Sequence, residues 1–549
     1  MSERAHLLEV ENLSVEFDTS RGVLRAVDEV SWHLDRGETL AILGESGSGK
    51  SVSASAVLGL IDSPPGFITS GRILFEGEDL LTKSEAERRQ INGQRIAMIF
   101  QDTLASFNPV YTVGWQIAEA FHAHGVTGRE AHSRTLELMR RVGIPDPERR
   151  IRDYPHQFSG GQRQRLMIAM AIALSPDILL ADEPTSALDV TVQAEILKLL
   201  KALQKDVGMG MLLITHDLGV AAEVADRVAV MQQGRIVETG PVAEVLGDPQ
   251  HPYTRRLLAA MPGRDFAPER PQDGDKPLLE VRDLSKSYQL RFGPFGRSGA
   301  PELLALDKAR FEVFKGETIG IVGESGSGKS TLARTLLRIE QPTSGDALFD
   351  GASLYGRAET KSLSRRIQAV FQDPSASLNP RLTVAEIIAE PWEIHPGVLA
   401  PRERPARIAE LLEQVGLDGS MASRYPHQFS GGQRQRIAIA RAMALRPELI
   451  VCDEAVSALD ASIQAQVVDL LRDLQRQYGM SYLFITHDLS VVRGFADRII
   501  VMQQGRIVEQ GPTRQIFEAP QSDYTRQLLA SRPLLERHYF DTSTQKHSK

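Results

Sequence analysis

The sequence predicts two consecutive α/β domains related by duplication, and three observations support this prediction. Five motifs occur twice along the 549 residues, namely GESGSGKS, FSGGQRQR, SALD, ITHDL and MQQGRIVE. Matching positions keep a nearly constant spacing, since Gln101 and Gln372 are 271 positions apart and so are His216 and His487. Short apolar runs precede the motifs in both copies. A repeat of this length is a whole domain, because solenoid repeats are roughly 20–50 residues long.

The apolar runs have the length of buried strands. Four or five apolar residues bounded by turns are typical of a mostly parallel sheet that is covered on both faces. Between Gln101 and Phe158 the apolar period becomes helical instead, and we expect a helical insert in each α/β core. In the second copy this period is carried by Ile408, Leu411, Leu412 and Val415. The predicted strands are Thr39–Leu43, Ile178–Ala181 and Met211–Ile214, and in the second copy Thr318–Val322, Leu449–Cys452 and Tyr482–Ile485.

Composition along the chain predicts the domain limits. We expect a first domain over residues 1–260, a linker over 261–277, a second domain over 278–532 and a tail over 533–549. The linker MPGRDFAPERPQDGDKP is rich in proline, glycine and charge. The second copy has extra residues before its Gly-rich motif, which we place in an exposed loop at Phe292–Pro301. The polar tail is expected to be loosely ordered.

The overall composition excludes several classes of protein. Hydrophobic residues make up 42% and charged residues 24%, as in a soluble globular protein. A net charge of -8 without a long basic block argues against a nucleic-acid partner. The single cysteine, Cys452, excludes disulfides and cysteine-ligated clusters, and we expect it in the core. No leader peptide or membrane span is expected, because the longest apolar candidate, Leu166–Ala181, is interrupted by Pro176 and Asp177.

The motif GESGSGKS matches the phosphate-binding loop GxxxxGK[ST], between a predicted strand and a helix. Glycines let backbone N–H groups approach phosphate oxygens, and the helix N-terminus adds a positive dipole end. We expect Lys50 and Lys329 to reach the β- and γ-phosphates, and Ser51 and Ser330 to bind Mg²⁺. Chance similarity is a negligible explanation for two such loops. The other predicted nucleotide-binding positions are Gly44, Ser46, Gly47, Ser48, Gly49 and Val52, and Gly323, Ser325, Gly326, Ser327, Gly328 and Thr331.

Two acidic residues follow one of the predicted strands in each copy. Asp182 and Asp453 end apolar strands, where a carboxylate can hold Mg²⁺ through water. Glu183 and Glu454 come next, and a carboxylate there can orient or deprotonate an attacking water molecule. An ordinary acidic loop is the alternative, but a phosphate loop upstream at matching spacing argues against it.

A histidine and a glutamine follow two further strands of each copy. His216 and His487 follow the strands of the ITHD motifs, and a neutral imidazole can hydrogen-bond the γ-phosphate and the glutamate-bound water. A lone histidine at a strand end is usually structural, yet its duplication favours the functional role. Gln101 and Gln372 end the runs IAMIFQ and IQAVFQ, where they suit a sensor that contacts the γ-phosphate and Mg²⁺.

The SGGQ sequences, which we call the signature motifs, open a predicted helix. Their hydroxyl, their glycine N–H groups and the helix dipole suit a second anion site. Each domain already has a phosphate loop, so this second site implies a partner domain. A simple serine helix cap is the alternative. The residues are Ser159, Gly160, Gly161 and Gln162, and Ser430, Gly431, Gly432 and Gln433.

Two aromatic residues occupy matching positions near the start of each copy. Phe17 and Tyr288 are 271 positions apart, in the contexts VEFD and KSYQ. We expect each ring to stack on adenine, and a core aromatic at a strand edge is the alternative.

Together these residues resemble the ATP-binding-cassette (ABC) ATPases, over nearly the whole chain and twice. The resemblance implies an α/β P-loop fold in which each domain has a RecA-like core, an antiparallel β subdomain and a helical subdomain. It also implies ATP and Mg²⁺ as cofactors and a head-to-tail arrangement with two composite sites. One site then combines Lys50, Asp182, Glu183 and His216 with Ser430–Gln433, and the other combines Lys329, Asp453, Glu454 and His487 with Ser159–Gln162.

The departures from the family pattern are mild. Val52 replaces the commoner threonine, and Ala455 and Val456 stand where the first copy has Pro184 and Thr185. None of these changes removes an expected ligand. We therefore expect two sites that both hydrolyse ATP.

A finer resemblance points to the dipeptide/oligopeptide/nickel importers, and a single fused chain is similar to the microcin-C-type and glutathione-type peptide importer ATPases. FQDxxxSxNP occurs at Phe100–Pro109 and Phe371–Pro380, and YPHQFSGGQRQR occurs in both copies. A short extension follows each domain, HPYTRRLLA at His251–Ala259 and SDYTRQLLA at Ser522–Ala530. Some members of this branch carry a cysteine cluster in the extension, and this chain does not.

This resemblance implies an ATP-hydrolysing motor of a bacterial peptide importer, peripheral to the cytoplasmic face of the inner membrane. Its partners would be two integral-membrane permease subunits and an extracytoplasmic peptide-binding protein, without an obligatory self-dimer. The rival interpretation is a soluble tandem ABC protein acting on ribosomes or DNA. A short linker of mixed charge and a single cysteine argue against it. Peptide as the solute rests on the resemblance alone.

Overall fold

The computed structural model describes residues 6–19, 22–186, 188–261, 266, 276–289, 302–356, 360–457 and 459–532. The chain forms two compact units, the first built from residues 6–188 and 192–260 and the second from 189–191 and 261–532. The linker and the loop at Phe292–Pro301 fall largely outside the described residues, and the tail falls wholly outside them. The predicted domain limits therefore stay predictions.

The first unit is built on a six-stranded, mostly parallel sheet in the order β10-β9-β3-β8-β7-β6. All predicted strands of this copy are confirmed, and their residues are buried because both faces of the sheet are covered. The edge strand β10 runs antiparallel to β9. The strands are β3 (Thr39–Leu43), β6 (Ile96–Ile99), β7 (Ile178–Asp182), β8 (Gly210–Thr215), β9 (Arg227–Gln232) and β10 (Arg235–Pro241).

A second, antiparallel sheet in the order β2-β1-β4-β5 belongs to the same unit. Its inward residues, among them Leu8, Val10 and Val15, share one hydrophobic core with Leu40 and Ile42 of the parallel sheet. The antiparallel sheet is thereby fixed to the strand that precedes the phosphate loop. Its strands are β1 (Leu8–Thr19), β2 (Gly22–Leu34), β4 (Gly66–Phe75) and β5 (Glu78–Asp79).

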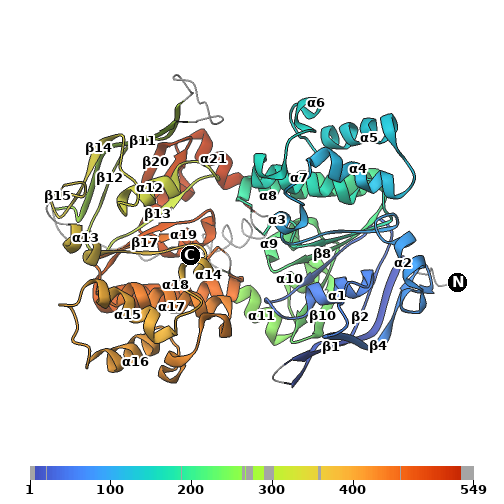
Figure 1. Ribbon diagram of the computed structural model, residues 1–549, viewed down its shortest axis with the longest axis horizontal. Coiled ribbons are helices and arrows are strands. Elements are labelled where there is room, and N and C mark those ends of the chain that lie inside the picture. Colours follow the sequence, from blue (N-terminus) through green and yellow to red (C-terminus); the bar gives the residue numbers. More distant parts are fainter. Residues whose placement is uncertain are drawn as a thin grey trace, which may run out of the picture. The chain divides into compact units, whose positions relative to one another are not determined.

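The helices of the first unit include the predicted insert between Gln101 and Phe158, which forms α3 to α6. In Figure 1 helices α4, α5 and α7 lie together, apart from β1, β2 and β4. The helices are α1 (Lys50–Leu58), α2 (Glu85–Ile91), α3 (Thr103–Ser106), α4 (Val113–Ala123), α5 (Gly128–Arg141), α6 (Pro147–Arg150), α7 (Gly160–Ala171), α8 (Val190–Val207), α9 (Leu218–Val224), α10 (Val242–Gly247) and α11 (Pro252–Ala259), with 3₁₀ turns η1 (Leu80–Thr82) and η2 (Pro155–Gln157).

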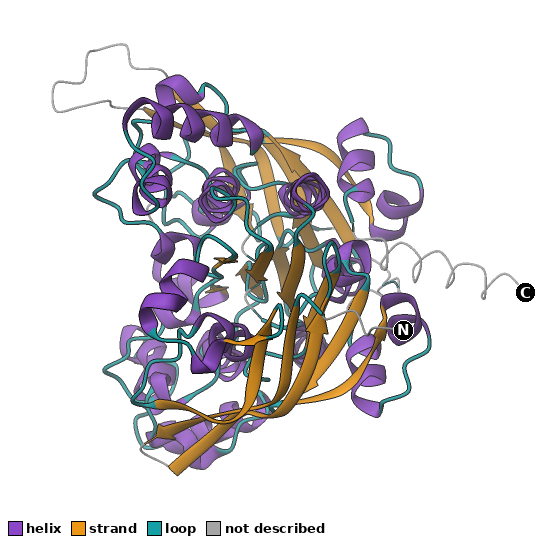
Figure 2. Cartoon of the chain, turned by 90° about the vertical axis from the view of Figure 1, so that its right-hand side faces the viewer, coloured by secondary structure: helices purple, strands orange, loops and turns teal. Residues whose placement is uncertain are grey.

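The second unit repeats both sheets, in the orders β16-β17-β18-β13-β19-β20 and β12-β11-β14-β15. Figure 2 shows helices lying beside the strands. The predicted strands are again confirmed. The strands are β11 (Leu279–Gln289), β12 (Glu302–Val313), β13 (Thr318–Val322), β14 (Ser344–Phe349), β15 (Ala352–Ser353), β16 (Ile367–Val370), β17 (Leu449–Asp453), β18 (Ser481–Ile485), β19 (Arg498–Gln503) and β20 (Arg506–Pro512).

The helical insert of the second unit confirms the predicted period, since Ile408, Leu411, Leu412 and Val415 are all buried in one core cluster. The helices are α12 (Lys329–Leu336), α13 (Thr360–Arg366), α14 (Pro374–Ser377), α15 (Val384–Ile394), α16 (Arg404–Gln414), α17 (Gly431–Met443), α18 (Ala461–Tyr478), α19 (Leu489–Phe495), α20 (Thr513–Glu518) and α21 (Asp523–Ala530), with 3₁₀ turns η3 (Gly419–Ser423) and η4 (Pro426–Gln428).

The expectation that Cys452 lies in the core is also confirmed. Cys452 is a free thiol in the core, and burial raises its pKa to about 12. Among the residues that the structure describes, every helix is too short or too polar to cross a membrane.

Candidate nucleotide site

The phosphate loop of each unit joins the central strand to the helix that follows it, as predicted. Gly44 directly follows β3 with φ 156°, and a Cβ there would lie 2.2 Å from the carbonyl oxygen of Met231. Gly323 repeats this with φ 150° and 2.2 Å to the carbonyl oxygen of Met502. A side chain at either position would collide with backbone, so only glycine lets the loop pass this close to the neighbouring strand.

The loop lysines are buried and point back into their own loops. Lys50 Nζ donates to the carbonyl oxygens of Gly44 and Glu45, each at 2.8 Å. Lys329 Nζ donates to Gly323 at 2.7 Å and to Glu324 at 2.8 Å. Burial lowers the pKa of Lys329. Each ammonium is therefore held by two backbone carbonyls of its own loop, where phosphate oxygens are expected.

The structure brings the predicted metal-binding hydroxyl and carboxylate together. Ser51 Oγ donates to Asp182 Oδ1 at 3.0 Å, and Ser330 Oγ donates to Asp453 Oδ1 at 3.3 Å. Burial raises the pKa of Asp182 to about 6, although the hydrogen bond from Ser51 opposes this shift. Burial also raises the pKa of Asp453. An adjacent pair of oxygen donors fits the ligand preference of Mg²⁺.

Glu183 stands at the centre of the predicted catalytic groups. Gln101 Nε2 donates to Glu183 Oε2 at 2.7 Å, and His216 Nδ1 lies 2.9 Å from Glu183 Oε1. The glutamate adopts φ 46°, a left-handed conformation that is uncommon outside glycine and clusters at functional sites. The ends of β6, β7 and β8 thus bring three side chains together, with Gln101 and His216 both contacting the Glu183 carboxylate. In this arrangement the Gln101 amide contacts the glutamate rather than the pair formed by Ser51 and Asp182.

The second unit repeats this group with a longer histidine contact. Gln372 Nε2 donates to Glu454 Oε2 at 2.7 Å, while His487 Nδ1 lies 3.7 Å from Glu454 Oε1. Glu454 has φ 50°. Both units therefore place the glutamate in the same backbone conformation, and they differ in how closely the imidazole approaches.

The charges of these groups depend on one another. Burial favours a neutral Glu183, but the facing His216 and the charge of Lys50 outweigh burial and lower the pKa of the carboxyl. Burial likewise favours a neutral imidazole, yet Glu183 and Asp217 raise the pKa of His216. In the second unit, His487 lowers the pKa of Glu454, and Glu454 raises the pKa of His487 against the effect of burial. Each glutamate is thus kept ionised, as a residue that polarises water requires.

The signature motifs open α7 and α17 as predicted, and their serines cap these helices. Ser159 Oγ accepts the backbone N–H of Gln162 at 3.3 Å, and Gln162 Oε1 accepts the N–H of Ser159 at 3.3 Å. Ser430 and Gln433 form the same reciprocal pair, at 3.4 and 3.1 Å. The capping role considered from the sequence is therefore real. Among the described residues of each unit, no hydrogen bond joins the signature motif to the phosphate loop of that unit.

The two predicted adenine-stacking residues have different surroundings. Phe17 is partly buried against the core of the antiparallel sheet. The hydroxyl of Tyr288 contacts Glu340, and Lys286 Nζ lies 5.2 Å from the centre of the tyrosine ring. Adenine stacking stays a prediction for both.

One pair of loop contacts was missed from the sequence. The hydroxyl of Tyr253 accepts the backbone N–H of Glu45 at 3.2 Å, and the hydroxyl of Tyr524 accepts that of Glu324 at 3.1 Å. Both tyrosines belong to the duplicated extensions HPYT and SDYT. The duplication of this tyrosine was the available indication, but it did not show which part of the fold the residue would reach.

Comparison with known families agrees with this geometry. The ABC transporter family matches residues 27–186 and 306–457, and the oligopeptide/dipeptide transporter C-terminal region matches residues 237–288 and 508–547. The chain is 51% identical over 529 residues to the peptidoglycan transport ATP-binding protein YejF of Agrobacterium fabrum, covering 96% of each chain. It is 48% identical over 564 residues to the glutathione import ATP-binding protein GsiA of Escherichia coli strain K12, covering 97% of this chain and 90% of the relative.

A solved structure, the ATP-binding cassette MJ0796 bound to ADP and Pi, is 30% identical, with a TM-score of 0.38, over 43% of this chain and 99% of that chain. The family match covers more than half of the sequence, and the curated relatives extend along nearly all of it. The chain therefore belongs to the ABC transporter family, as a subunit with two tandem ATP-binding cassettes that hydrolyses ATP to drive transport.

Proposed function

We propose that this ATPase drives the uptake of small peptides, including glutathione, through an ABC importer. The observation that carries this proposal is the oligopeptide/dipeptide transporter C-terminal region, which follows both cassettes. The names of the two relatives, a peptidoglycan transport protein and a glutathione import protein, support the same class of solute. Peptidoglycan fragments and glutathione both contain short peptides, so we propose a short peptide as the solute.

We propose that Ser51 and Asp182, and Ser330 and Asp453, hold Mg²⁺ with ATP. When bound, the ion would neutralise phosphate charge. The lysines would exchange their loop carbonyl partners for the β- and γ-phosphate oxygens. Glu183 and Glu454, kept ionised by their histidines, would orient the attacking water and accept its proton.

We also propose that each signature motif completes the nucleotide site of the other cassette. Every group that could hold phosphate and Mg²⁺ is intact in both cassettes. Because the two cassettes share one chain, the linker keeps each at a high effective concentration for the other. Two active ATP sites would then form without self-dimerisation.

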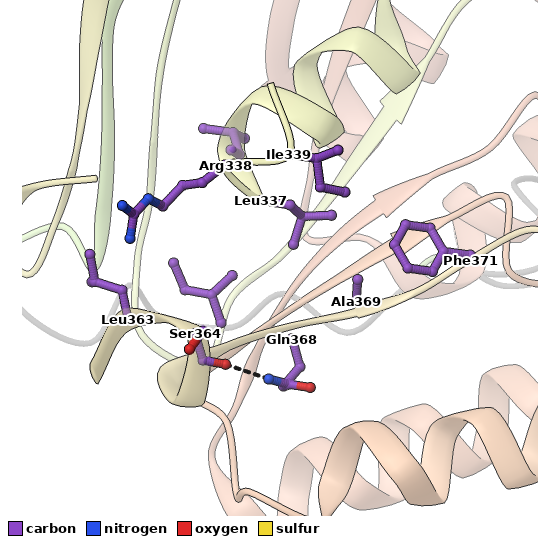
Figure 3. Close-up of a pocket in the computed structure, with 10 residues that line it drawn as sticks. Leu337, Arg338, Ile339, Leu363, Ser364, Gln368, Ala369 and Phe371 are labelled. Atoms are coloured by element: carbon purple, nitrogen blue, oxygen red, sulfur yellow. Dashed lines mark hydrogen bonds between the residues drawn. The ribbon is translucent and has the colours of Figure 1, made fainter. Parts of the chain in front are cut away.

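A surface pocket beside the glutamine of the second cassette is the proposed docking place for a permease. Its volume is about 350 Å³, and it lies between the end of α12 and the segment from α13 to β16. Figure 3 shows Leu337, Ile339 and Phe371 around it, and Phe371 immediately precedes Gln372. A bound helix that moved Phe371 would therefore also move Gln372, whose amide contacts the proposed catalytic Glu454. The lining residues are Leu336, Leu337, Arg338, Ile339, Leu363, Ser364, Ile367, Gln368, Ala369 and Phe371.

The first cassette exposes apolar side chains at the matching positions. Leu60 is 49% exposed where the second cassette has Ile339 at 59%, and Phe100 is 44% exposed beside Gln101. In the second cassette the matching residues Ile339 and Phe371 line one pocket, and grouped apolar side chains of this kind mark an interaction surface. We propose that each cassette receives an apolar cytoplasmic helix of one integral-membrane permease subunit, which places the chain at the cytoplasmic face of the inner membrane. An extracytoplasmic peptide-binding protein would deliver the solute.

The proposal is tested by isolating the protein with its membrane partners from detergent-solubilised membranes. We expect two integral-membrane subunits to co-purify, and short peptides to raise the ATPase rate in the presence of the binding protein. Ile339→Glu should reduce co-purification, whereas Ile394→Glu, at an equally exposed position of the same cassette outside the pocket, should not. A chain that instead co-purifies with ribosomes or DNA, and never with membrane subunits, would contradict the importer.

A further inference from the structure

The extension after each cassette ends in a short helix whose second residue touches the phosphate loop. Tyr253 is the second residue of α11 and Tyr524 the second residue of α21. Both rings are buried, with 3% and 8% of their surface exposed. Their hydroxyls accept the N–H of the loop's second residue, Glu45 or Glu324, at 3.2 and 3.1 Å. The same contact thus occurs in two cassettes whose extensions differ in sequence around the tyrosine.

A carboxylate from the last strand fixes where this helix begins. Glu238 of β10 accepts the backbone N–H groups of Gln250 at 2.7 Å and His251 at 3.1 Å. Glu509 of β20 does the same for Gln521 at 2.8 Å and Ser522 at 3.0 Å. The glutamate belongs to the duplicated motif MQQGRIVE. The start of the helix, and with it the tyrosine, is therefore tied to the parallel sheet.

The helix is also held by its apolar side. Leu257 and Leu258 are each 8% exposed, and Leu528 and Leu529 are 4% and 7% exposed. In the second cassette, Tyr524, Leu528 and Leu529 share a hydrophobic cluster with Val322 of β13, the strand that leads into the phosphate loop. The tyrosine hydroxyl is thus presented to the loop by a packed element.

The tyrosine and the loop lysine contact the same peptide group, the tyrosine at its N–H and the lysine at its carbonyl. The carbonyl of Gly44 and the N–H of Glu45 form a single planar unit whose two polar groups point in opposite directions. Lys50 Nζ donates to that carbonyl at 2.8 Å, while Tyr253 accepts from that N–H. In the second cassette, Lys329 and Tyr524 hold the peptide group between Gly323 and Glu324 in the same way.

We propose that Tyr253 and Tyr524 are positioning residues that fix the first peptide group of each phosphate loop in the orientation that nucleotide binding requires. The glycine that precedes this group permits many backbone conformations, so an external acceptor is needed to select one. The inference rests on the proposed assignment of the loops as the nucleotide sites. It gives the C-terminal extensions a role inside the cassette.

The test is ADP binding, measured by calorimetry with the full-length chain, because ADP occupies the loop without turnover. Tyr253→Phe and Tyr524→Phe keep the ring and its packing and remove only the hydroxyl. We expect the combined variant to bind ADP about two- to tenfold more weakly, the loss typical of one hydrogen bond. The KM for ATP should rise by a similar factor, with little change in kcat.

Tyr482→Phe is the matched control, because the Tyr482 hydroxyl is buried in the second cassette and donates to the carbonyl of Leu471 at 3.0 Å. We expect it to lower the unfolding temperature and leave ADP affinity unchanged. Unchanged ADP affinity in both tyrosine variants of the extensions, or an equal loss in Tyr482→Phe, would overturn the inference. The variant that combines Lys50→Ala with Lys329→Ala distinguishes a failure of the tyrosine inference from a failure of the site assignment. Unchanged ADP affinity in that variant would reject the loops as the nucleotide sites.

Discussion

Alanine at the second glycine of a signature motif is expected to destabilise the cassette, whereas alanine at the first glycine is not. A Cβ on Gly161 would lie 2.5 Å from Cγ1 of Val192 on α8, and a Cβ on Gly160 would meet only Leu188 at 3.9 Å. The valine is β-branched and stiff at χ1, so its methyl group cannot rotate away. Of these two glycines, therefore, only Gly161 is needed for the close approach of α7 to α8.

The second cassette has the same asymmetry. A Cβ on Gly432 would lie 2.4 Å from Cγ2 of Ile463, and a Cβ on Gly431 would lie 3.9 Å from Leu459. Overpacking of this kind costs about 1–3 kcal/mol. The gain in helix propensity from glycine to alanine is common to both positions and cancels when the two variants are compared. For a domain of this size, that difference corresponds to about 2–12 °C in unfolding temperature.

The assay is thermal unfolding of the four single alanine variants by calorimetry, together with their ATPase rates. Gly161→Ala and Gly432→Ala should unfold earlier than Gly160→Ala and Gly431→Ala. The latter two should keep their stability but lose ATPase activity, because the added methyl stands at the exposed helix end where phosphate is proposed to approach. Equal unfolding temperatures within each pair would refute the packing argument, and full activity of Gly160→Ala would refute the proposed anion site.

Three further predictions concern the proposed metal ligand, the histidine and the two aromatic residues. Asp182→Asn should raise the Mg²⁺ concentration for half-maximal ATPase activity by about 10–100-fold, as expected for a carboxylate that holds the ion through water. An unchanged Mg²⁺ titration would argue against that role. Because the pKa of His216 is raised in the folded state, its protonation stabilises the fold below the unfolded pKa of about 6.5, and this stability is lost as the pH rises through the folded pKa. The wild type should therefore unfold at a higher temperature than His216→Gln by a margin that shrinks between pH 5.5 and 9. A constant difference would count against the pairing with Glu183. Phe17→Ala, and likewise Tyr288→Ala in the second cassette, should weaken ATP binding by the stacking energy of about 1–3 kcal/mol, and binding of wild-type strength would leave both as structural aromatics.

Much of the fold could be predicted because the strands are short apolar runs with turns at both ends. Thr39–Leu43 and Thr318–Val322 form strands with these limits, since every residue in them is buried on a fully covered sheet. The meeting of the candidate catalytic groups could be predicted because they follow such strands closely. Residues that follow neighbouring parallel strands emerge at the same edge of the sheet, which is why Gln101, Glu183 and His216 meet.

The remaining features depend on contacts between distant segments. The hydrogen bond between Tyr253 and the loop joins residues more than 200 positions apart, and no local pattern encodes it. The different roles of the two signature glycines depend on where α8 lies, although the sequence presents them as equivalent. The histidine contact differs between the cassettes, 2.9 Å to Glu183 and 3.7 Å to Glu454, within identical ITHDL motifs.

The central claim is that both cassettes hydrolyse ATP, and separate measurement of Glu183→Gln and Glu454→Gln tests it most directly. Each substitution removes the carboxylate that we propose accepts the proton of water, a contribution of about 10²–10⁴-fold to the rate at its own site. With the steady-state ATPase rate of the full-length chain as the readout, we expect both single variants to lose at least half of the activity and the double variant to lose nearly all of it. One variant with wild-type activity, beside a second that is inactive, would contradict the account.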